Sequence, residues 1–273
     1  MKSLTRSKSN IFVLIFMTIC SLLLIISIVN IIKWNIDKNK TKENIKKIND
    51  NTIIEKIQDD ENTTIIETEN PKKSNPYWDY IKMDMINVDF EQLKQVNNEV
   101  KGWIQVKGTN INYPFVQHEN NSFYLTHGID KSPNNAGWLF LDYRNNIDNL
   151  SKNTIIYAHG RVDNTMFGSL KNVLKESWIN NKDNHVINIA TEKESSLWQI
   201  FSVYHIPTTS DYITTTFNTK ESWNNFTKTL INRSFYNFNT NITTNDKILT
   251  LSTCYNDREK MVIHAKLIKI RKN

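Results

Sequence analysis

The sequence predicts a mostly β domain, built as an antiparallel barrel or sandwich with helical inserts. From about residue 77 onwards, short runs alternate apolar and polar residues or are rich in β-branched residues, as strands are. These runs outnumber the predicted helices and do not alternate with them, which argues against a doubly wound α/β sheet. The predicted strands are residues 102–108, 111–117, 136–143, 153–160, 185–192, 196–206, 247–254 and 260–270.

Three segments between or before these runs are predicted to be helical. Residues 88–100 begin with Asp89 as a potential N-cap, followed three residues later by Gln92. Residues 166–174 and 219–234 are the other two. The sequence contains no internal repeat.

Composition and charge exclude several classes of protein. Hydrophobic residues make up 39% of the 273 residues, enough for a packed core, and the net charge is +6. The basic residues are scattered, which fits a surface facing an anionic membrane or wall polymer, and no nucleic-acid-binding motif is present. CxxC, HExxH and glycine-rich nucleotide motifs are missing from the sequence. We therefore expect no nucleic-acid partner, no metal site and no cofactor.

The N-terminal region predicts a membrane anchor followed by a linker. Residues 11–32 carry no charge, and at about 1.5 Å per residue they suffice to cross the roughly 30 Å hydrocarbon layer. A cleaved signal peptide is the alternative, but no small-x-small cleavage site follows. Lysines flank the run on both sides, so charge alone does not fix its orientation. We expect residues 1–10 as an N-terminal tail, 33–76 as a solvated stalk or short coiled coil, and 77–273 as the folded domain.

The two cysteines place one thiol in the predicted domain. Cys20 lies inside the apolar run, so Cys254 has no partner for an intramolecular disulfide if that run spans a membrane. A lone thiol is either a small core residue or a reactive one. Reactivity requires the thiolate, which a nearby cation or hydrogen-bond donor stabilises.

Among the six histidines, His159 is the best partner for this thiol. It follows the apolar run 153–158 at a predicted strand tip, where functional side chains are commonly held. Asp142 is a possible third member that orients an imidazole, or a structural turn residue. Arg258 and Lys260 follow the cysteine closely and are either functional or part of a solvated turn.

Several segments resemble one enzyme family. TLSTC (residues 250–254) and VIHAKL (262–267) resemble sortases. INYPFVQ (111–117), FLDYRN (140–145) and NTIIYAHGRVDNTMFGSL (153–170) resemble class B sortases in particular. The resemblance is collinear from about residue 77 to the C-terminus.

The resemblance implies a closed sortase β-barrel of about eight strands, with an N-terminal helical extension and a helix between the sixth and seventh strands, matched by residues 219–234. It also implies a single-pass enzyme of the Gram-positive cell membrane, with its catalytic domain outside the cell. Such cysteine transpeptidases cut surface proteins at a C-terminal sorting signal resembling Asn-Pro-x-Thr-x, after its Thr. They join the Thr carbonyl to an amine of the peptidoglycan precursor, lipid II. This activity fixes the expected orientation of the anchor.

Residue roles follow from the matching positions. Cys254 corresponds to the nucleophile that forms a thioacyl intermediate, and His159 to the general acid and base. The family's third residue is an arginine directly before the apolar run of the last strand, where this chain has Lys260. Arg258 is two residues earlier and would share a face with Lys260 on an extended strand. Because lysine lacks the planar fork of donors, we favour Arg258 over Lys260 as the oxyanion donor.

Positions that match substrate-contacting residues of the family are Leu125, Thr208, Tyr212, Ile213 and Ser252. For each, packing or a solvated loop is the alternative. Asp142 resembles a class B feature without a catalytic role. Other functions on the same fold are a pilin-polymerising sortase, a hydrolytic cysteine protease and a catalytically weak anchored binding module.

Overall fold

The computed structural model describes residues 2–66 and 76–273. Helix α1 (Lys2–Asn51) begins the chain, and its apolar part, residues 11–32, is exposed along its length. It contains a stretch that is long and apolar enough to cross a membrane. Residues 1–43 and 44–273 form two separate compact units, and the second unit holds all the strands.

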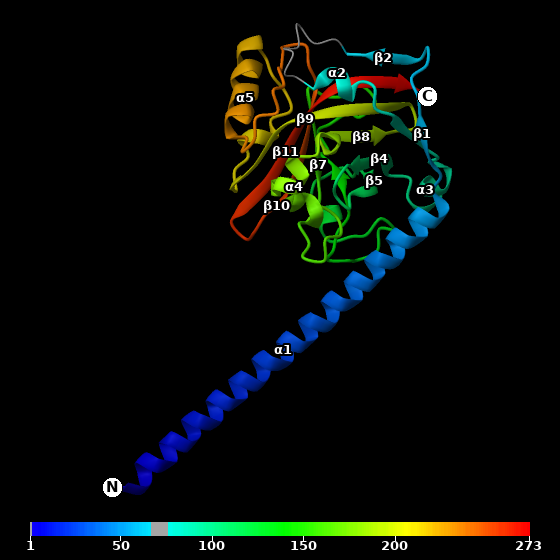
Figure 1. The fold of residues 1–273 in the computed structure, drawn as a ribbon. Helices are drawn as coiled ribbons and strands as arrows, with labels where there is room; N and C mark the ends of the chain where they lie inside the picture. The colour runs from blue at the N-terminus through cyan, green and yellow to red at the C-terminus, as the bar shows by residue number, and fades with distance from the viewer. Residues whose placement is uncertain (1, 67–75) are drawn as a thin grey trace. The chain divides into compact units, whose positions relative to one another are not determined.

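The second unit is built around a closed β-barrel, as predicted (Figure 1). Its strands run in the order β10-β7-β6-β5-β4-β8-β9-β11, and β11 pairs back onto β10 to close the sheet. Every predicted strand is present in this barrel. The strands are β4 (Val100–Val106), β5 (Asn112–Val116), β6 (Phe140–Leu141), β7 (Asn153–Tyr157), β8 (Val186–Ala190), β9 (Glu194–Pro207), β10 (Ile248–Cys254) and β11 (Glu259–Lys272).

Most barrel neighbours are antiparallel, but β5 runs parallel to β6, and β7 runs parallel to β10. Strands β7 and β10 lie side by side although about a hundred residues separate them in the sequence, and the chain emerges from both at the same end of the barrel. β10 is buried at every position except its last residue, Cys254. The rigid strand therefore presents a single side chain to solvent at its tip.

The helices agree with the sequence prediction in position but differ in detail. The predicted segment 88–100 is helical only in α3 (Glu91–Val96); its N-cap is Phe90 and not Asp89, whose carboxylate accepts from the Glu91 amide at 2.9 Å. The predicted segment 166–174 forms the 3-10 helix η2 (Gly168–Leu174).

The predicted segment 219–234 forms α5 (Lys220–Arg233) between β9 and β10, the sixth and seventh barrel strands. Thr219 and Ser222 form a capping box at its start. α5 lies against β9 (Figure 1), where Trp223 and Leu230 join a buried cluster with Phe201. The remaining helices of the second unit are α2 (Tyr77–Tyr80), η1 (Phe123–Leu125), α4 (Glu176–Ile179), η3 (Lys182–Asn184) and η4 (Asp211–Ile213).

The structure differs from the solvated stalk expected for residues 33–76. α1 continues to Asn51, and residues 44–66 belong to the second unit. β1 (Ile54–Ile57) pairs with β3 (Met85–Val88), and β2 (Thr63–Ile65) pairs with β11 beyond the end of β10. Residues 67–75 of the expected stalk lie outside the described residues.

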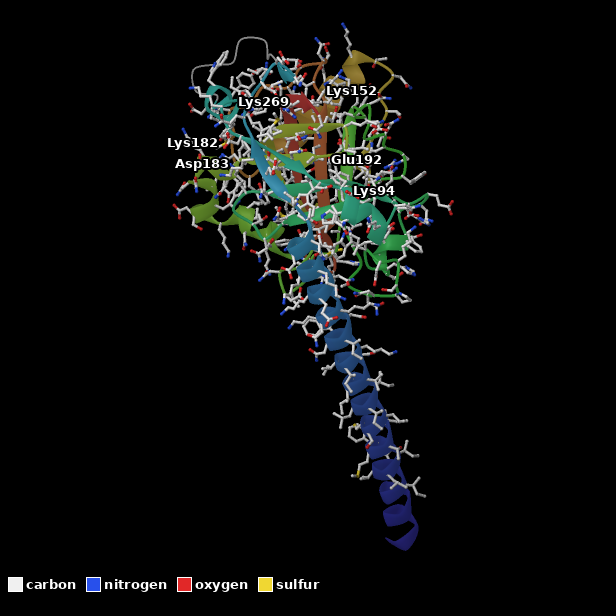
Figure 2. All side chains as sticks on the ribbon, turned by 90° about the vertical axis from the view of Figure 1, so that its right-hand side faces the viewer. Lys94, Lys152, Lys182, Asp183, Glu192 and Lys269 are labelled. Carbon is white, nitrogen blue, oxygen red and sulfur yellow. The ribbon has the colours of Figure 1, made fainter. Side chains whose placement is uncertain are left out.

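Acidic residues of this segment form ion pairs with basic residues of the barrel strand β11. Lys269 of β11, labelled in Figure 2, is 1% exposed and donates to Asp59 at 2.7 Å. Arg271 pairs with Asp60, also at 2.7 Å. A buried ammonium without such a partner would be strongly unfavourable, so the acidic pair helps to hold β2 on the barrel.

Candidate active site

Cys254 ends β10, and its thiol is exposed and free of any disulfide. In the antiparallel β10–β11 pair, Cys254 stands directly opposite Lys260. Side chains of directly opposed residues project from the same face of a sheet. The Lys260 Nζ accordingly donates to the Cys254 Sγ at 3.1 Å. A cation at this distance stabilises negative charge on the sulfur.

His159 lies beside Cys254 because β7 and β10 are in parallel register. Ser252 is the register partner of Tyr157, so the same register places His159, two residues on, next to Cys254. The alignment continues past the end of β7, since the Thr253 hydroxyl donates to the Ala158 carbonyl at 2.7 Å. The two chains therefore remain in contact up to the predicted catalytic pair.

Gly160 permits this close approach. A Cβ added at Gly160 would lie 2.1 Å from the backbone carbonyl oxygen of Cys254, far inside van der Waals contact. Any larger residue there would push the cysteine backbone away from the end of β7. The absence of a side chain at Gly160 thus allows the backbone of Cys254 to lie close to the chain that follows β7.

A backbone carbonyl orients the His159 ring. The Leu125 carbonyl oxygen lies 2.8 Å from the His159 Nε2. A carbonyl only accepts hydrogen bonds, so Nε2 carries a proton and Nδ1 is the nitrogen that can exchange one. Leu125 was predicted as a substrate contact, and its side chain is 38% exposed at the end of η1. Its backbone contact with the histidine was missed because main-chain groups leave no signature in a sequence.

Arg258 does not join this cluster. β11 begins at Glu259, so Arg258 lies in the exposed turn after Cys254, and the shared-face argument for a strand does not apply. Among the described residues its side chain has no hydrogen bond or ion pair, whereas its carbonyl accepts from the Thr208 amide at 3.1 Å. The structure therefore favours Lys260 over Arg258 as the cation beside the thiol.

The predicted substrate-contacting residues divide into two groups. In the first group, the hydroxyl oxygens of Tyr212 and Ser252 lie 3.0 Å apart. Ser252 lies on β10, two residues before the nucleophile. Burial raises the pKa of Tyr212, so its hydroxyl is protonated at neutral pH. Thr208 contacts the turn that carries Arg258, and Ile213 is held through its backbone carbonyl.

The other histidines pair with residues other than Cys254 and Lys260, although His205 lies nearby, stacked on Tyr255. His264 is fully buried between Thr250 and Tyr204, and burial lowers its pKa to about 3. The remaining pairs are His118 with Glu99, His127 with the Phe123 carbonyl, His185 with Tyr80 and His205 with Glu259. Within residues 2–66 and 76–273, no cluster of three or more His, Cys, Asp or Glu residues could hold a metal ion.

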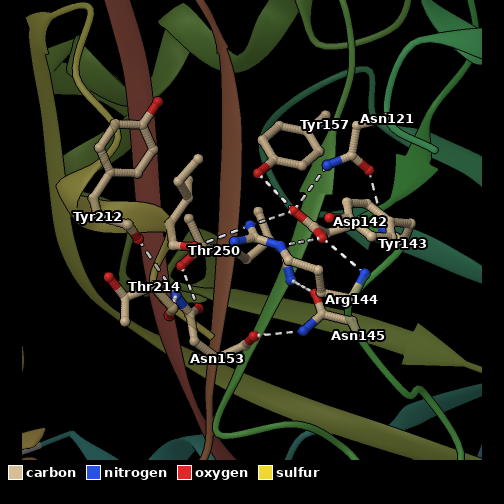
Figure 3. A network of polar contacts seen from close by, with 12 residues as sticks. Asn121, Asp142, Tyr143, Arg144, Asn145, Asn153, Tyr157, Tyr212, Thr214 and Thr250 are labelled. Carbon is tan, nitrogen blue, oxygen red and sulfur yellow. Dashed lines mark hydrogen bonds and ion pairs between the residues drawn. The ribbon is translucent and has the colours of Figure 1, made fainter. Parts of the chain in front are cut away.

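Asp142 is the centre of a buried polar network and not a partner of His159 (Figure 3). Its carboxylate accepts two hydrogen bonds from the Arg144 guanidinium, at 2.8 and 2.7 Å, and one from the Tyr157 hydroxyl at 3.0 Å. Burial acts to raise the pKa of Asp142, but the hydrogen bonds from Arg144 and Tyr157 outweigh it and hold that pKa below its ordinary value. The carboxylate is therefore ionised and joins Arg144 to Tyr157 within the network.

Comparison with known proteins identifies the family. The family model described as the sortase domain matches residues 104–268. Sortase B of Staphylococcus aureus (strain NCTC 8325 / PS 47) is 35% identical over 189 residues, covering 68% of this chain and 77% of that protein. The chain belongs to the class B sortases.

Further relatives agree with this assignment. Sortase B of Listeria monocytogenes serovar 1/2a (strain ATCC BAA-679 / EGD-e) is 34% identical over 188 residues, covering 66% of this chain and 74% of that protein. The structure of the Staphylococcus aureus sortase B–substrate complex matches with a TM-score of 0.62 and 35% identity, covering 66% of this chain and 84% of that chain. This sortase is therefore a cysteine transpeptidase on the sortase barrel.

Proposed function

We propose that this sortase cleaves a sorting signal resembling Asn-Pro-x-Thr-x after its Thr and transfers the acyl group to an amine of the peptidoglycan precursor, lipid II. The single observation that supports this most is the convergence of an exposed thiol, an oriented imidazole and an ammonium at the tips of β7, β10 and β11. This is the set of groups that acyl transfer through a thioester requires.

The reaction divides into two halves around the Cys254 sulfur. The thiolate attacks the Thr carbonyl carbon, and the new C–S bond pushes negative charge onto the carbonyl oxygen. As the C–N bond breaks, protonated His159 gives its proton to the leaving amine, and a thioacyl intermediate remains. The acceptor amine then attacks the thioester, neutral His159 takes its proton, and breakage of the C–S bond restores the thiolate.

We assign Lys260 as the cation that stabilises both the Cys254 thiolate and the oxyanion of the tetrahedral intermediate. Its Nζ lies 3.1 Å from the sulfur, so it also lies near the oxygen of a tetrahedral carbon bonded to that sulfur. Such a preorganised donor stabilises the developing oxyanion. Lysine offers a point charge and no planar fork. Arg258 lies in the turn before β11, and only its backbone makes hydrogen bonds with described residues.

The substrate peptide is proposed to contact five positions. Ser252 precedes the nucleophile on β10, and Tyr212 joins it from η4. The others are Leu125, whose carbonyl contacts His159, Thr208, which contacts the turn that carries Arg258, and Ile213, the last residue of η4. For Ser252 and Tyr212 the proposal is supported by their contact two residues before Cys254, and for the other three by the family resemblance.

The proposed location is the cell membrane, with residues 1–10 inside the cell, residues 11–32 as a single-pass anchor and the barrel outside. The exposed apolar part of α1 supports this proposal. Surface proteins with a C-terminal sorting signal and wall precursors would then meet the enzyme at the same membrane face. Because residues 44–66 pack with the barrel, any linker between anchor and barrel is shorter than the sequence predicted.

The test is product analysis with the full-length protein in detergent micelles. With an Asn-Pro-x-Thr-x peptide and hydroxylamine, we expect a Thr-hydroxamate whose formation is abolished in Cys254→Ala. Cleavage by water alone would indicate a protease. Binding without turnover would indicate a binding module, and transfer only to a protein lysine would indicate a pilin polymerase.

A further inference from the structure

Segment η4 and the residue after it are attached to the barrel by side chains. Three consecutive carbonyls, those of Tyr212, Ile213 and Thr214, each accept a hydrogen bond from a side chain of β7 or of the turn after β6. The Asn153 Nδ2 donates to the first at 3.3 Å and to the third at 3.0 Å, and the Arg144 guanidinium donates to the second at 3.1 Å. A 3-10 helix leaves its last carbonyls unpaired, so these donors supply what the backbone lacks.

Both donors are themselves held in place. Arg144 is locked by its two hydrogen bonds to the buried Asp142. Asn153 begins β7, and its Oδ1 accepts from the Thr250 hydroxyl of β10 at 2.6 Å. Figure 3 shows Asn153 between Thr250 and the carbonyls of Tyr212 and Thr214, with Arg144 on the Asp142 side. The η4 backbone is thereby fixed to β7, the strand that leads to His159, and through Thr250 to β10, the strand that ends in Cys254.

One side chain of η4, that of Tyr212, reaches the catalytic strand. Tyr212 is 3% exposed, and its hydroxyl reaches Ser252, two residues before Cys254. Arg233 of α5 holds the other end of η4 through an ion pair with Asp211. If Arg144 and Asn153 released the carbonyls, the Tyr212 hydroxyl would lose its fixed position beside Ser252.

We propose that Arg144 and Asn153 are positioning residues that hold η4 against β10, so that the acyl-donor peptide meets a preformed wall beside Cys254. They act on peptide binding and not on the thiol. This inference rests on the proposed function for the identity of the peptide, but the attachment of η4 is a separate physical claim. Preorganisation of this kind lowers the entropic cost of binding.

The test compares Arg144→Lys with Arg271→Lys as a matched control. Both variants keep the positive charge of a paired arginine, but Arg271 pairs with Asp60 in the segment between β1 and β2 and not with η4. Lysine can neutralise Asp142, which protects the fold, yet a single ammonium cannot also reproduce the fork that reaches Ile213. Asn153→Ala gives an independent second variant from the other side of η4.

We expect KM for the sorting peptide to rise about tenfold in Arg144→Lys and in Asn153→Ala with kcat changed less than about threefold, as when binding interactions are lost. Amide hydrogen exchange in residues 211–216 should become about tenfold faster, while exchange in β10 and the alkylation rate of Cys254 by iodoacetamide stay unchanged. Arg271→Lys should change none of these.

Unchanged exchange in residues 211–216 in both variants would overturn the proposal, as would a loss of kcat with KM unchanged. If the parent enzyme turned over no sorting peptide, the proposed function would fail, and the exchange measurement alone would then decide whether Arg144 and Asn153 hold η4.

Discussion

Replacing Lys260 by Gln tests whether its ammonium stabilises charge on the nucleophile. The Nζ–Sγ distance is 3.1 Å, and both groups are at least partly exposed. At that separation a water-like dielectric constant gives an attraction of about 1.3 kcal/mol, which corresponds to about a tenfold change in an equilibrium or rate. Because solvent surrounds the pair, we take this water-like value and not the larger value for a protein interior.

The assay is the rate of Cys254 alkylation by iodoacetamide at pH 7, followed by intact mass. Lys260→Gln should slow it about tenfold at low salt, and about 1 M salt should reduce that difference because it shortens the screening length to roughly 3 Å. Lys260→Arg should retain the parent rate within a few fold, and Arg258→Gln is the control, expected to react within about twofold of the parent. A larger loss in Arg258→Gln than in Lys260→Gln would refute the assignment of Lys260.

Three further predictions concern the surrounding structure. Gly160→Ala should lower kcat/KM at least about a hundredfold by displacing Cys254, because the new Cβ would overlap its carbonyl; retained activity in a steady-state peptide assay would contradict that contact. Tyr212→Phe, which loses the hydroxyl contact with Ser252, should raise KM about threefold to tenfold with kcat nearly unchanged, whereas an effect on kcat alone would argue against a binding role. Burial lowers the pKa of His264 from 6.5 to about 3, so between these pH values the unfolded state binds more protons than the folded state. The free energy of unfolding should therefore fall as the pH is lowered through this range, by up to about 1.4 kcal/mol per pH unit. Urea melts of His264→Gln should show a weaker dependence of that free energy on pH.

The barrel could be predicted because its strands carry their own signal. Runs such as 196–206 and 260–270 combine alternation with β-branched and aromatic residues, and both form long strands, β9 and β11. β1 and β2 carry almost no such signal. They have four and three residues and owe their pairing to the exposed edges of β3 and β11, which lie far away in the sequence. From local composition alone, both strands were therefore predicted to be part of a solvated stalk.

The site divides in the same way. Cys254 and His159 were predicted from strand-tip motifs and a family resemblance, and the parallel register of β7 and β10 brings their strand tips together. The choice between Arg258 and Lys260 depended on where the turn ends, which a short polar stretch does not reveal. Of the two, Lys260 lies in β11 opposite the thiol, whereas Arg258 lies in the turn before β11.

Backbone groups account for the rest of what the sequence could not show. The Leu125 carbonyl orients His159, and the carbonyls of η4 are held by Arg144 and Asn153. A carbonyl is common to every residue type, so only the folded chain shows which ones have a specific partner.

The most direct measurement is intact mass spectrometry of the full-length enzyme quenched during turnover of an Asn-Pro-x-Thr-x peptide. We predict an adduct equal in mass to the peptide up to its Thr, located on Cys254 and discharged by hydroxylamine to the Thr-hydroxamate. An adduct on another residue, or turnover that persists in Cys254→Ala, would contradict thioester chemistry at the tip of β10.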